Sequence, residues 1–380
     1  MAYQTNQTPN LYALLIGIDC YLPNQLPDGS YYKSLSGCVR DITHVEAFLK
    51  NTLKVSEQRI LKLTASNTGA SQPPESPTQW PTYENMVMKF KELTQKAQPG
   101  EQVYIHYSGH GGRPETIYRK LKGDDGIDEA LVPMDIGDST ARYLRDLELA
   151  KLLKEMVDKK LVVTLVLDSC HSGGATRGGD SDIRGLDNNV VDRTTRNTES
   201  LVASYNELET NWLALTGGNA RKLSASGWLP ESNDYVLLAA CRQNESAYEY
   251  AFDGKQRNGA LTYWLLDTLE QLGAGNSYKV LHDRIFAKVH SKFQQQTPML
   301  QGTGNRVVFG SDRVSLEYTA TVLQVDLENK QVKLDVGQVH GLRKGAEFAI
   351  YSLGTTDFNT ARLRDKGGKI KDFLFAYKTR

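Results

Sequence analysis

Short apolar runs alternate with stretches of helical periodicity along most of the chain. Each run is apolar at nearly every position, as expected for strands buried on both faces of a parallel sheet. These runs are residues 11–18, 59–63, 102–107, 161–167 and 235–240, and a sixth strand is expected at 297–301. The pattern predicts a core of short, buried, mostly parallel strands.

Between these runs, apolar residues recur at spacings of three and four, which is typical of amphipathic helices. The expected helices lie near residues 40–53, 83–97, 144–158, 259–272 and 278–293. Strands that alternate with helices favour crossover connections and helices on both faces of the sheet. The sequence therefore predicts an α/β sandwich with a mostly parallel sheet of six or more strands.

Other stretches depart from this alternation. Residues 66–81 are rich in Ser, Thr, Pro and Gly and predict a loop. Residues 173–233 are rich in Gly, Asp, Asn and Arg, with one helix expected near 199–208. A connection of this length is usually functional or mobile. After the larger domain, 1–311, strands expected at 315–325, 331–336 and 347–351 predict a small all-β domain over 312–380.

Composition narrows the possible partners. The chain has 45 basic and 45 acidic residues and a formal net charge of zero, so bulk charge favours neither a nucleic acid nor an anionic membrane as partner. The first ten residues lack the basic region of a signal peptide, and the run 11–18 is too short to span a bilayer. Four cysteines without a CxxC motif indicate reduced thiols. We expect a soluble, cytoplasmic protein.

Two expected strands end in unusual polar tails. The strand at 102–107 runs into YSGHGG, which contains His110, and the strand at 161–167 runs into DSCHSGG, which contains Cys170. Reactive groups gather beyond the carboxyl ends of parallel strands. If these strands are neighbours, His110 and Cys170 face each other there. An imidazole activates a thiol by taking its proton and can later protonate a leaving amine.

Glycines beside His110 let the backbone approach a substrate closely. The N–H of Gly111, with that of Cys170, predicts an oxyanion hole. His171 is a rival base because it adjoins the cysteine. A zinc site built from Cys38, His110, Cys170 and His171 would lack local ligand spacing. Cys20 and Cys241 flank apolar strands, and we expect them to be small buried side chains.

The paired motifs YSGHGG and DSCHSGG resemble the histidine and cysteine loops of caspases, and more closely those of metacaspases and the prokaryotic orthocaspases. The segments ALLIGID, LSGCVRDI, LLAACRQNESAYE and NGALTYWLL are also similar to that family, and the resemblance covers about residues 11–310. It implies the caspase-hemoglobinase three-layer sandwich. The larger part would span about 1–176, a processing loop about 173–233 and the smaller part about 234–311.

The resemblance also implies site roles. His110 matches the general base and Cys170 the nucleophile of a cysteine endopeptidase. The residues that match the primary specificity (S1) pocket are Asp41, Ser108, Asp168 and Cys38. Two carboxylates in a partly buried slot repel each other unless a cation arrives, and a guanidinium matches them best. We therefore expect protein or peptide substrates with Arg or Lys at P1.

Such an enzyme could also cut its own long loop, because exposed polar loops are where nicking concentrates. The candidate positions for self-cleavage are Arg177, Arg184, Arg193, Arg196, Arg221 and Lys222. Calcium-dependent metacaspases carry a carboxylate shortly after CHSG, where this chain has Arg177. Asp124, Asp125 and Asp128 could still bind a hard cation, but the departure favours activity without calcium, and no metal or other cofactor is expected.

Two other functions remain open. One is a catalytically silent caspase-like scaffold that binds partners through its C-terminal β domain. The other is an enzyme of true caspase type with an acidic P1 residue, which Asp41 and Asp168 disfavour. Metacaspases resemble monomers whose sheet edge is covered, so we expect a monomer.

Overall fold

A computed structural model of the chain describes residues 10–138, 140–170, 182–186, 190–219, 227–272 and 275–314, together with four strands between residues 319 and 376. No helix within these ranges is both long enough and apolar enough to cross a bilayer.

A six-stranded sheet forms the centre of the main domain, with the strand order β12-β9-β7-β3-β1-β2. Neighbouring strands run parallel except for β12, which pairs antiparallel with β9. The strands are β1 (Leu11–Ile18), β2 (Ile60–Ala65), β3 (Gln102–Ser108), β7 (Val162–Asp168), β9 (Val236–Ala239) and β12 (Met299–Gly302). The predicted strands and the mostly parallel sheet are confirmed.

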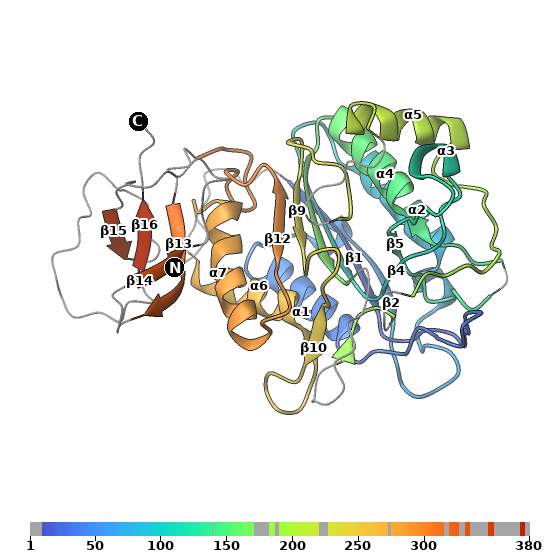
Figure 1. Cartoon of the computed structure of the whole chain (residues 1–380), viewed down its shortest axis with the longest axis horizontal. Coiled ribbons are helices and arrows are strands. Elements are labelled where there is room, and N and C mark those ends of the chain that lie inside the picture. The colour runs from blue at the N-terminus through green and yellow to red at the C-terminus, as the bar shows by residue number, and fades with distance from the viewer. Residues whose placement is uncertain are drawn as a thin grey trace.

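Helices cover both faces of this sheet (Figure 1). The helices α2 (Tyr83–Lys96), α4 (Asp146–Asp158) and α5 (Tyr205–Thr216) contribute to one apolar cluster, and α1 (Cys38–Asn51), α6 (Ala260–Gln271) and α7 (Tyr278–Lys292) contribute to the other. Phe90 and Trp212 are fully buried in the first cluster, and Leu49 and Ile285 in the second. The result is the predicted three-layer sandwich, with the motifs YSGHGG and DSCHSGG beginning at one end of its central layer.

The helix predicted near 199–208 is the one whose position was wrong. The observed α5 begins at Tyr205, because the Ser204 hydroxyl accepts from the Glu207 N–H while the Glu207 carboxylate accepts from the Ser204 N–H. This reciprocal cap stops the helix from extending backwards. Its buried side chain Trp212 lies beyond the predicted range.

Several elements are too short to show a periodicity in the sequence and were not predicted. They are the helix α3 (Arg119–Lys122), the 3₁₀ turns η1 (Glu57–Arg59) and η2 (Pro77–Gln79), the strands β4 (Gly111–Gly112), β5 (Ala130–Leu131) and β6 (Leu144–Arg145), and the strands β8 (Asp182–Ile183), β10 (Tyr248–Tyr250) and β11 (Asn258–Gly259). The last six strands form two three-stranded sheets, β4-β5-β6 and β11-β10-β8. Strand β4 belongs to the tail that contains His110, and β8 belongs to the long loop.

Beyond residue 314 the described residues form a four-stranded antiparallel sheet with the order β14-β13-β16-β15. The strands β13 (Thr319–Asp326), β14 (Gln331–Leu334) and β15 (Ala349–Ser352) overlap the three that the sequence predicts. The fourth, β16 (Phe373–Ala376), pairs with both β13 and β15 and was not predicted.

Candidate active site

The histidine and cysteine motifs begin side by side. In the parallel pairing of β3 with β7, Ser108 lies opposite Asp168, so the expectation that these strands are neighbours is confirmed. The Gly109 N–H donates to the Asp168 carbonyl at 3.4 Å, which keeps the tails together beyond the sheet. His110 and Cys170 each follow two residues after this register pair.

Two backbone donors converge on one carbonyl oxygen. The Gly111 N–H lies 3.2 Å, and the Cys170 N–H 3.3 Å, from the carbonyl oxygen of Arg184. A Cβ atom on Gly111 would lie 1.8 Å from the Cys170 carbonyl oxygen, so only glycine fits against this strand end. These donors are the two assigned to an oxyanion hole from the sequence, and the structure aims both at a carbonyl of the chain itself.

The side chain of Arg184 fills the acidic slot that was expected to receive a substrate. Its guanidinium is fully buried, with Nη2 2.8 Å from Asp41 Oδ2 and Nη1 3.2 Å from Asp168 Oδ1. Nη1 also donates to Ser108 Oγ at 2.7 Å, and that hydroxyl donates to Asp41 Oδ2. Three residues predicted for the pocket thus surround one arginine, which was predicted only as a possible cleavage position.

A third carboxylate in the slot escaped sequence analysis. Glu249, in β10, is fully buried, and its Oε2 lies 3.5 Å from Arg184 Nη2. Its Oε1 accepts from the Ser36 N–H at 3.2 Å. The segment LLAACRQNESAYE, which is similar to the family, ends at Glu249 but assigns that residue no role, because its place in the slot depends on the pairing of β10 with β8 and β11.

Cys38, the remaining residue predicted for the pocket, is fully buried at the start of α1. Its N–H donates to Asp19 Oδ1 at 2.7 Å. Burial raises the pKa of the Cys38 thiol well above its usual value, while the positive charge of Arg184 acts in the opposite direction. The thiol is therefore a neutral group near the guanidinium.

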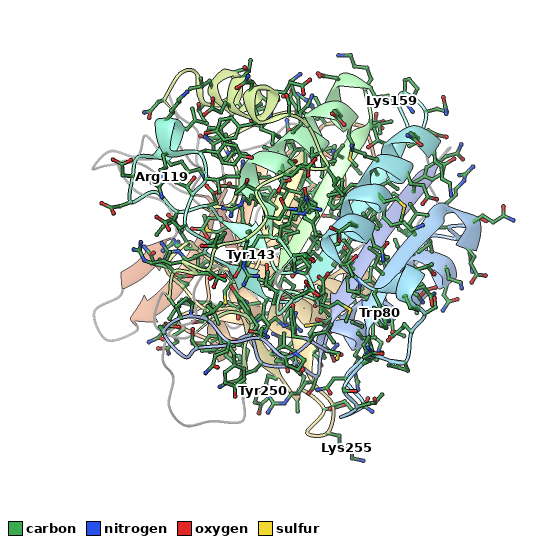
Figure 2. The ribbon with its side chains drawn as sticks, turned by 90° about the vertical axis from the view of Figure 1, so that its right-hand side faces the viewer. Trp80, Arg119, Tyr143, Lys159, Tyr250 and Lys255 are labelled. Carbon is green, nitrogen blue, oxygen red and sulfur yellow. The ribbon has the colours of Figure 1, made fainter. Side chains whose placement is uncertain are left out.

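The backbone around Arg184 runs as an added strand. Strand β8 pairs antiparallel with β10, with Ile183 opposite Tyr248. Figure 2 labels Tyr250, the last residue of β10. The Arg184 N–H continues this pairing by donating to the Ala247 carbonyl at 3.0 Å. Two residues later, Leu186 is buried in the apolar cluster that contains α2, α4 and α5. Residues 182–183 thus form a short added strand beside the site, and the chain bends at Arg184. Strand addition of this kind is how many proteins bind peptides.

The imidazole of His110 is buried and held in one orientation. Its Nε2 lies 2.7 Å from the Lys33 carbonyl oxygen, and the ring packs against Tyr21 and Tyr32 at centroid distances of 4.7 and 5.4 Å. Because a carbonyl only accepts, Nε2 carries the hydrogen and Nδ1 presents its lone pair. Burial lowers the pKa of His110 to about 4, against the opposite effect of the Lys33 carbonyl. The ring is therefore neutral near pH 7.

Cys170 is fully buried, and burial raises the pKa of its thiol to about 12, although the nearby Ala247 N–H acts in the opposite direction. Within the described residues, His110 Nδ1 has no hydrogen-bond partner. The thiol and the imidazole are thus both neutral here, and a proton must move before the sulfur can act as a nucleophile.

The pocket carboxylates are held by the beginning of α6. Asp41 Oδ1 accepts from the Gly259 N–H at 3.1 Å and from Asn258 Nδ2 at 2.7 Å. Asp168 Oδ2 accepts from the N–H of Thr262 at 2.8 Å and from its hydroxyl at 2.6 Å. A helix N-terminus stabilises anions through these free N–H groups. Burial still raises the pKa of Asp41 to about 6, although Arg184 lowers it.

The other candidate positions for self-cleavage lie elsewhere. Arg193 has 61% of its side chain exposed, whereas the Arg196 side chain is 7% exposed and pairs with Asp192 at 3.0 Å. The remaining candidates (Arg177, Arg221 and Lys222) and the rival base His171 lie outside the described residues.

The acidic residues considered for calcium do not act together. Asp124 and Asp125 are exposed, whereas Asp128 is buried and pairs with Lys122 Nζ at 2.8 Å and with Arg145. Lys122 also pairs with Asp146. No cluster of three or more His, Cys, Asp or Glu side chains suited to a metal occurs in the described ranges.

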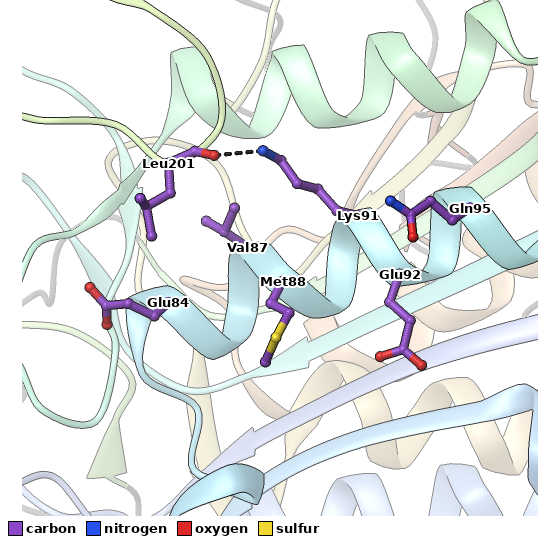
Figure 3. Close-up of a pocket in the computed structure, with 7 residues that line it drawn as sticks. All are labelled: Glu84, Val87, Met88, Lys91, Glu92, Gln95 and Leu201. Atoms are coloured by element: carbon purple, nitrogen blue, oxygen red, sulfur yellow. Dashed lines mark hydrogen bonds between the residues drawn. The ribbon is translucent and has the colours of Figure 1, made fainter.

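A separate surface depression lies over α2 (Figure 3). It is lined by Glu84, Val87, Met88, Lys91, Glu92, Gln95 and Leu201. Lys91 Nζ donates to the Leu201 carbonyl at 2.6 Å across it. These residues are distinct from those around Arg184, so the depression is no part of the site.

Comparison with known proteins places these residues in context. Residues 12–177 match the family described as "Metacaspase, peptidase C14 domain". Metacaspase-1B of Aspergillus terreus is 27% identical over 305 residues, which cover 75% of this chain and 73% of that protein. Metacaspase-1 of Kluyveromyces lactis is 27% identical over 318 residues, covering 78% and 67%. The crystal structure of Caspase-1 from Spodoptera frugiperda aligns with a TM-score of 0.43 at 12% identity, covering 83% of this chain and 95% of that one.

Proposed function

We propose that this chain, whose residues 12–177 match the metacaspase peptidase family and which is 27% identical to Metacaspase-1B of Aspergillus terreus, is a cysteine endopeptidase that cleaves after Arg or Lys and that first cuts itself between Arg184 and Gly185. In this proposal Cys170 is the nucleophile and His110 the general base. One observation carries it: the guanidinium of Arg184 lies among the pocket carboxylates while its carbonyl oxygen accepts from the Gly111 and Cys170 N–H groups.

The proposed reaction begins with a proton transfer from Cys170 Sγ to His110 Nδ1. The Lys33 carbonyl, which accepts from Nε2, holds the ring and stabilises its charged form. The thiolate then attacks the Arg184 carbonyl carbon, and the Gly111 and Cys170 N–H groups stabilise the oxyanion that develops. The imidazolium next gives its proton to the Gly185 nitrogen as the peptide bond breaks. Water hydrolyses the resulting thioester and regenerates the thiol.

The pocket charge supports the basic preference. Asp41, Asp168 and Glu249 place three carboxylates within 3.5 Å of one guanidinium. An aspartate at P1 would add a fourth negative charge in the same buried volume, which is strongly unfavourable. A planar guanidinium can meet several carboxylates at once, whereas an ammonium is a compact charge. We therefore expect Arg to be preferred over Lys.

Self-cleavage follows from the occupancy of the pocket. The segment of β8 and Arg184 fills the place of a substrate strand against β10, so an external peptide has to displace it. Its attachment to the same chain gives it a high effective concentration at the site. Cutting after Arg184 is thus proposed to be the first turnover, and release of the new chain end would open the pocket to other proteins.

We also propose that this activity does not need calcium. Two buried carboxylates, that of Asp128 and that of Asp146 at the start of α4, both pair with the Lys122 ammonium. The Lys122 ammonium therefore neutralises the negative charge of these two carboxylates, which a bound metal ion would otherwise have to do. Equal self-cleavage in millimolar calcium and in a chelator is expected, and a strict calcium requirement would contradict the proposal.

The test compares purified wild type with Cys170→Ala by mass spectrometry of the intact chain and its fragments. Wild type should produce a fragment that ends at Arg184 and one that begins at Gly185, and Cys170→Ala should remain whole. Cys20→Ala is the matched control, since it also removes a buried thiol. Fragments that persist in Cys170→Ala would remove the nucleophile assignment, and a first cut at another residue would remove Arg184.

A further inference from the structure

A chain of four buried side chains runs from the interior of the sheet to the pocket. The Tyr104 hydroxyl lies 2.8 Å from His106 Nδ1, and His106 Nε2 lies 2.9 Å from the Thr262 hydroxyl oxygen. That hydroxyl donates to Asp168 Oδ2 at 2.6 Å. The catalytic scheme above uses neither His106 nor Thr262, yet both connect directly to a carboxylate that holds the P1 side chain.

Each hydrogen-bonding proton in this series of four side chains has only one consistent position. Asp168, paired with the Arg184 guanidinium, is an acceptor only, so the Thr262 hydroxyl must donate to it. The same hydroxyl then accepts from His106 Nε2–H, and His106 Nδ1 accepts from the Tyr104 hydroxyl. Burial lowers the pKa of His106 to about 3, so its ring is neutral and supplies one donor and one acceptor. Hydrogen bonds aligned in one direction strengthen one another.

These hydrogen bonds determine which carboxylate oxygen of Asp168 faces the P1 side chain. The N–H and the hydroxyl of Thr262 both engage Oδ2, so Oδ1 is the oxygen that lies 3.2 Å from Arg184 Nη1. Asp41 is held by different donors, Asn258 and Gly259. A change at His106 or Thr262 should therefore affect Asp168 and leave Asp41 in place.

We propose that Thr262 and His106 are positioning residues of the P1 pocket, which orient Asp168 for a basic side chain without contacting that side chain themselves. This assignment rests on the proposed function, because it concerns the same pocket. The hydrogen bonds of Arg184 go to Ser108, to Asp41 and to the Asp168 carbonyl, so the two residues act through Asp168.

The first test uses the self-processed full chain and a peptide with Arg at P1. Thr262→Val keeps the side-chain shape but removes the hydroxyl, and KM should rise by about tenfold while kcat stays within about threefold. Thr262→Ser restores the hydroxyl and should return KM to within about twofold of wild type. A fall in kcat at unchanged KM, or equal defects in the Val and Ser variants, would overturn the proposal.

Thr268→Val is the matched control. Thr268 is also fully buried in α6, but its hydroxyl accepts from Lys288 Nζ at 3.2 Å, not from the pocket network. This variant should leave KM unchanged. If it raises KM as much as Thr262→Val does, the effect is a general loss of helix packing and the positioning role is wrong.

The second pair of variants tests His106. It also tests the same positioning role if Thr262→Val does not fold. His106→Gln can keep an N–H close to the Nε2 position, whereas His106→Leu cannot. The Gln variant should stay within about threefold of the wild-type KM, and the Leu variant should exceed it about tenfold. Equal KM values for the two would show that the donor at this position is irrelevant.

A binding measurement separates this inference from the proposed function. In Cys170→Ala/Arg184→Ala the nucleophile and the occupant of the pocket are both absent. The peptide acetyl-Asp-Ile-Arg-Gly-Leu-amide is titrated into this chain with and without Thr262→Val, and the substitution should weaken binding about tenfold. If wild type cuts no peptide but this difference appears, the proposed function fails and the positioning role stands. If wild type cuts and the difference is absent, the reverse holds.

Discussion

Arg184 Nη2 and Asp41 Oδ2 lie 2.8 Å apart, both side chains are fully buried, and 143 positions of sequence separate them. A buried ion pair costs much desolvation free energy and by itself says little about stability. What distinguishes this pair is the backbone of the same arginine, whose carbonyl oxygen lies between two N–H donors beside a cysteine. A purely structural ion pair would not require that arrangement, whereas a peptide bond awaiting cleavage does.

Replacing Arg184 should change where the chain is cut. Arg184→Ala leaves no cation for the slot and should abolish the cut before Gly185, while Arg184→Lys should be cut more slowly because an ammonium meets fewer of the carboxylates. Intact-mass measurements over a time course would follow both variants. Arg193→Ala is the control, as it removes an exposed arginine of the same loop. A cut before Gly185 in Arg184→Ala at the wild-type rate would contradict the pocket assignment.

Neutralising one pocket carboxylate should weaken the basic preference. Asp41→Asn keeps the size of the side chain but removes a charge that lies 2.8 Å from the guanidinium. Loss of one partner from a buried charge pair predicts a decrease in kcat/KM of about a hundredfold or more for Arg at P1. Asp253→Asn is the control, because Asp253 is an exposed residue that pairs with Arg40. Similar kcat/KM values for the two variants would contradict the prediction.

A methyl group on Gly111 should disturb the two N–H donors at the Arg184 carbonyl. Its Cβ atom would lie 1.8 Å from the Cys170 carbonyl oxygen, so the backbone has to shift. Loss of one donor from an oxyanion hole typically lowers kcat by about 10²- to 10³-fold. Gly304→Ala is a mild counterpart, since its Cβ would approach only side-chain atoms, those of Leu300 at 3.1 Å and of Lys279 at 3.8 Å. Stopped assays of Arg-P1 peptide turnover measure kcat for both, and an unchanged kcat in Gly111→Ala would exclude the donor role.

The buried His106 should make stability depend on pH. Its pKa is about 3 in the folded chain against 6.5 ordinarily, so the unfolded chain binds the proton more tightly. Its contribution is therefore fully present above pH 6.5 and is lost as the pH falls towards 3. Between about pH 7.5 and about pH 5 this amounts to roughly 2 kcal/mol.

Urea titrations of Cys170→Ala, which cannot cut itself, would measure this contribution. The free energy of unfolding should fall between about pH 7.5 and about pH 5 by roughly 2 kcal/mol less when His106→Gln is added, because the glutamine does not titrate. His110 and the buried carboxylates are common to both chains and cancel in the comparison. Parallel pH profiles would show that His106 titrates equally in the folded and unfolded chain.

Much of the fold could be predicted because its information is local. Strands β1, β3 and β7 are nearly continuous apolar runs in the sequence. In helices α2 and α7 the apolar residues recur at helical spacing. Elements of two or three residues, such as β8 and β10, carry no such period. They exist because β8 pairs with β10, and a pairing between segments that are distant in the sequence produces no recognisable pattern in either segment.

The order of the strands and the two motifs were sufficient to place His110 and Cys170 at neighbouring strand ends, since parallel strands present their carboxyl ends at one edge. Sequence also marked Asp41, Ser108 and Asp168 through a family pattern. It could not reveal that Arg184, one basic residue among several in a long loop, occupies their pocket, or that Glu249, Thr262 and the Lys33 carbonyl complete the site. Those assignments depend on burial and distance. The guanidinium of Arg184 is stabilised only because carboxylates from separate elements of the fold come together around it.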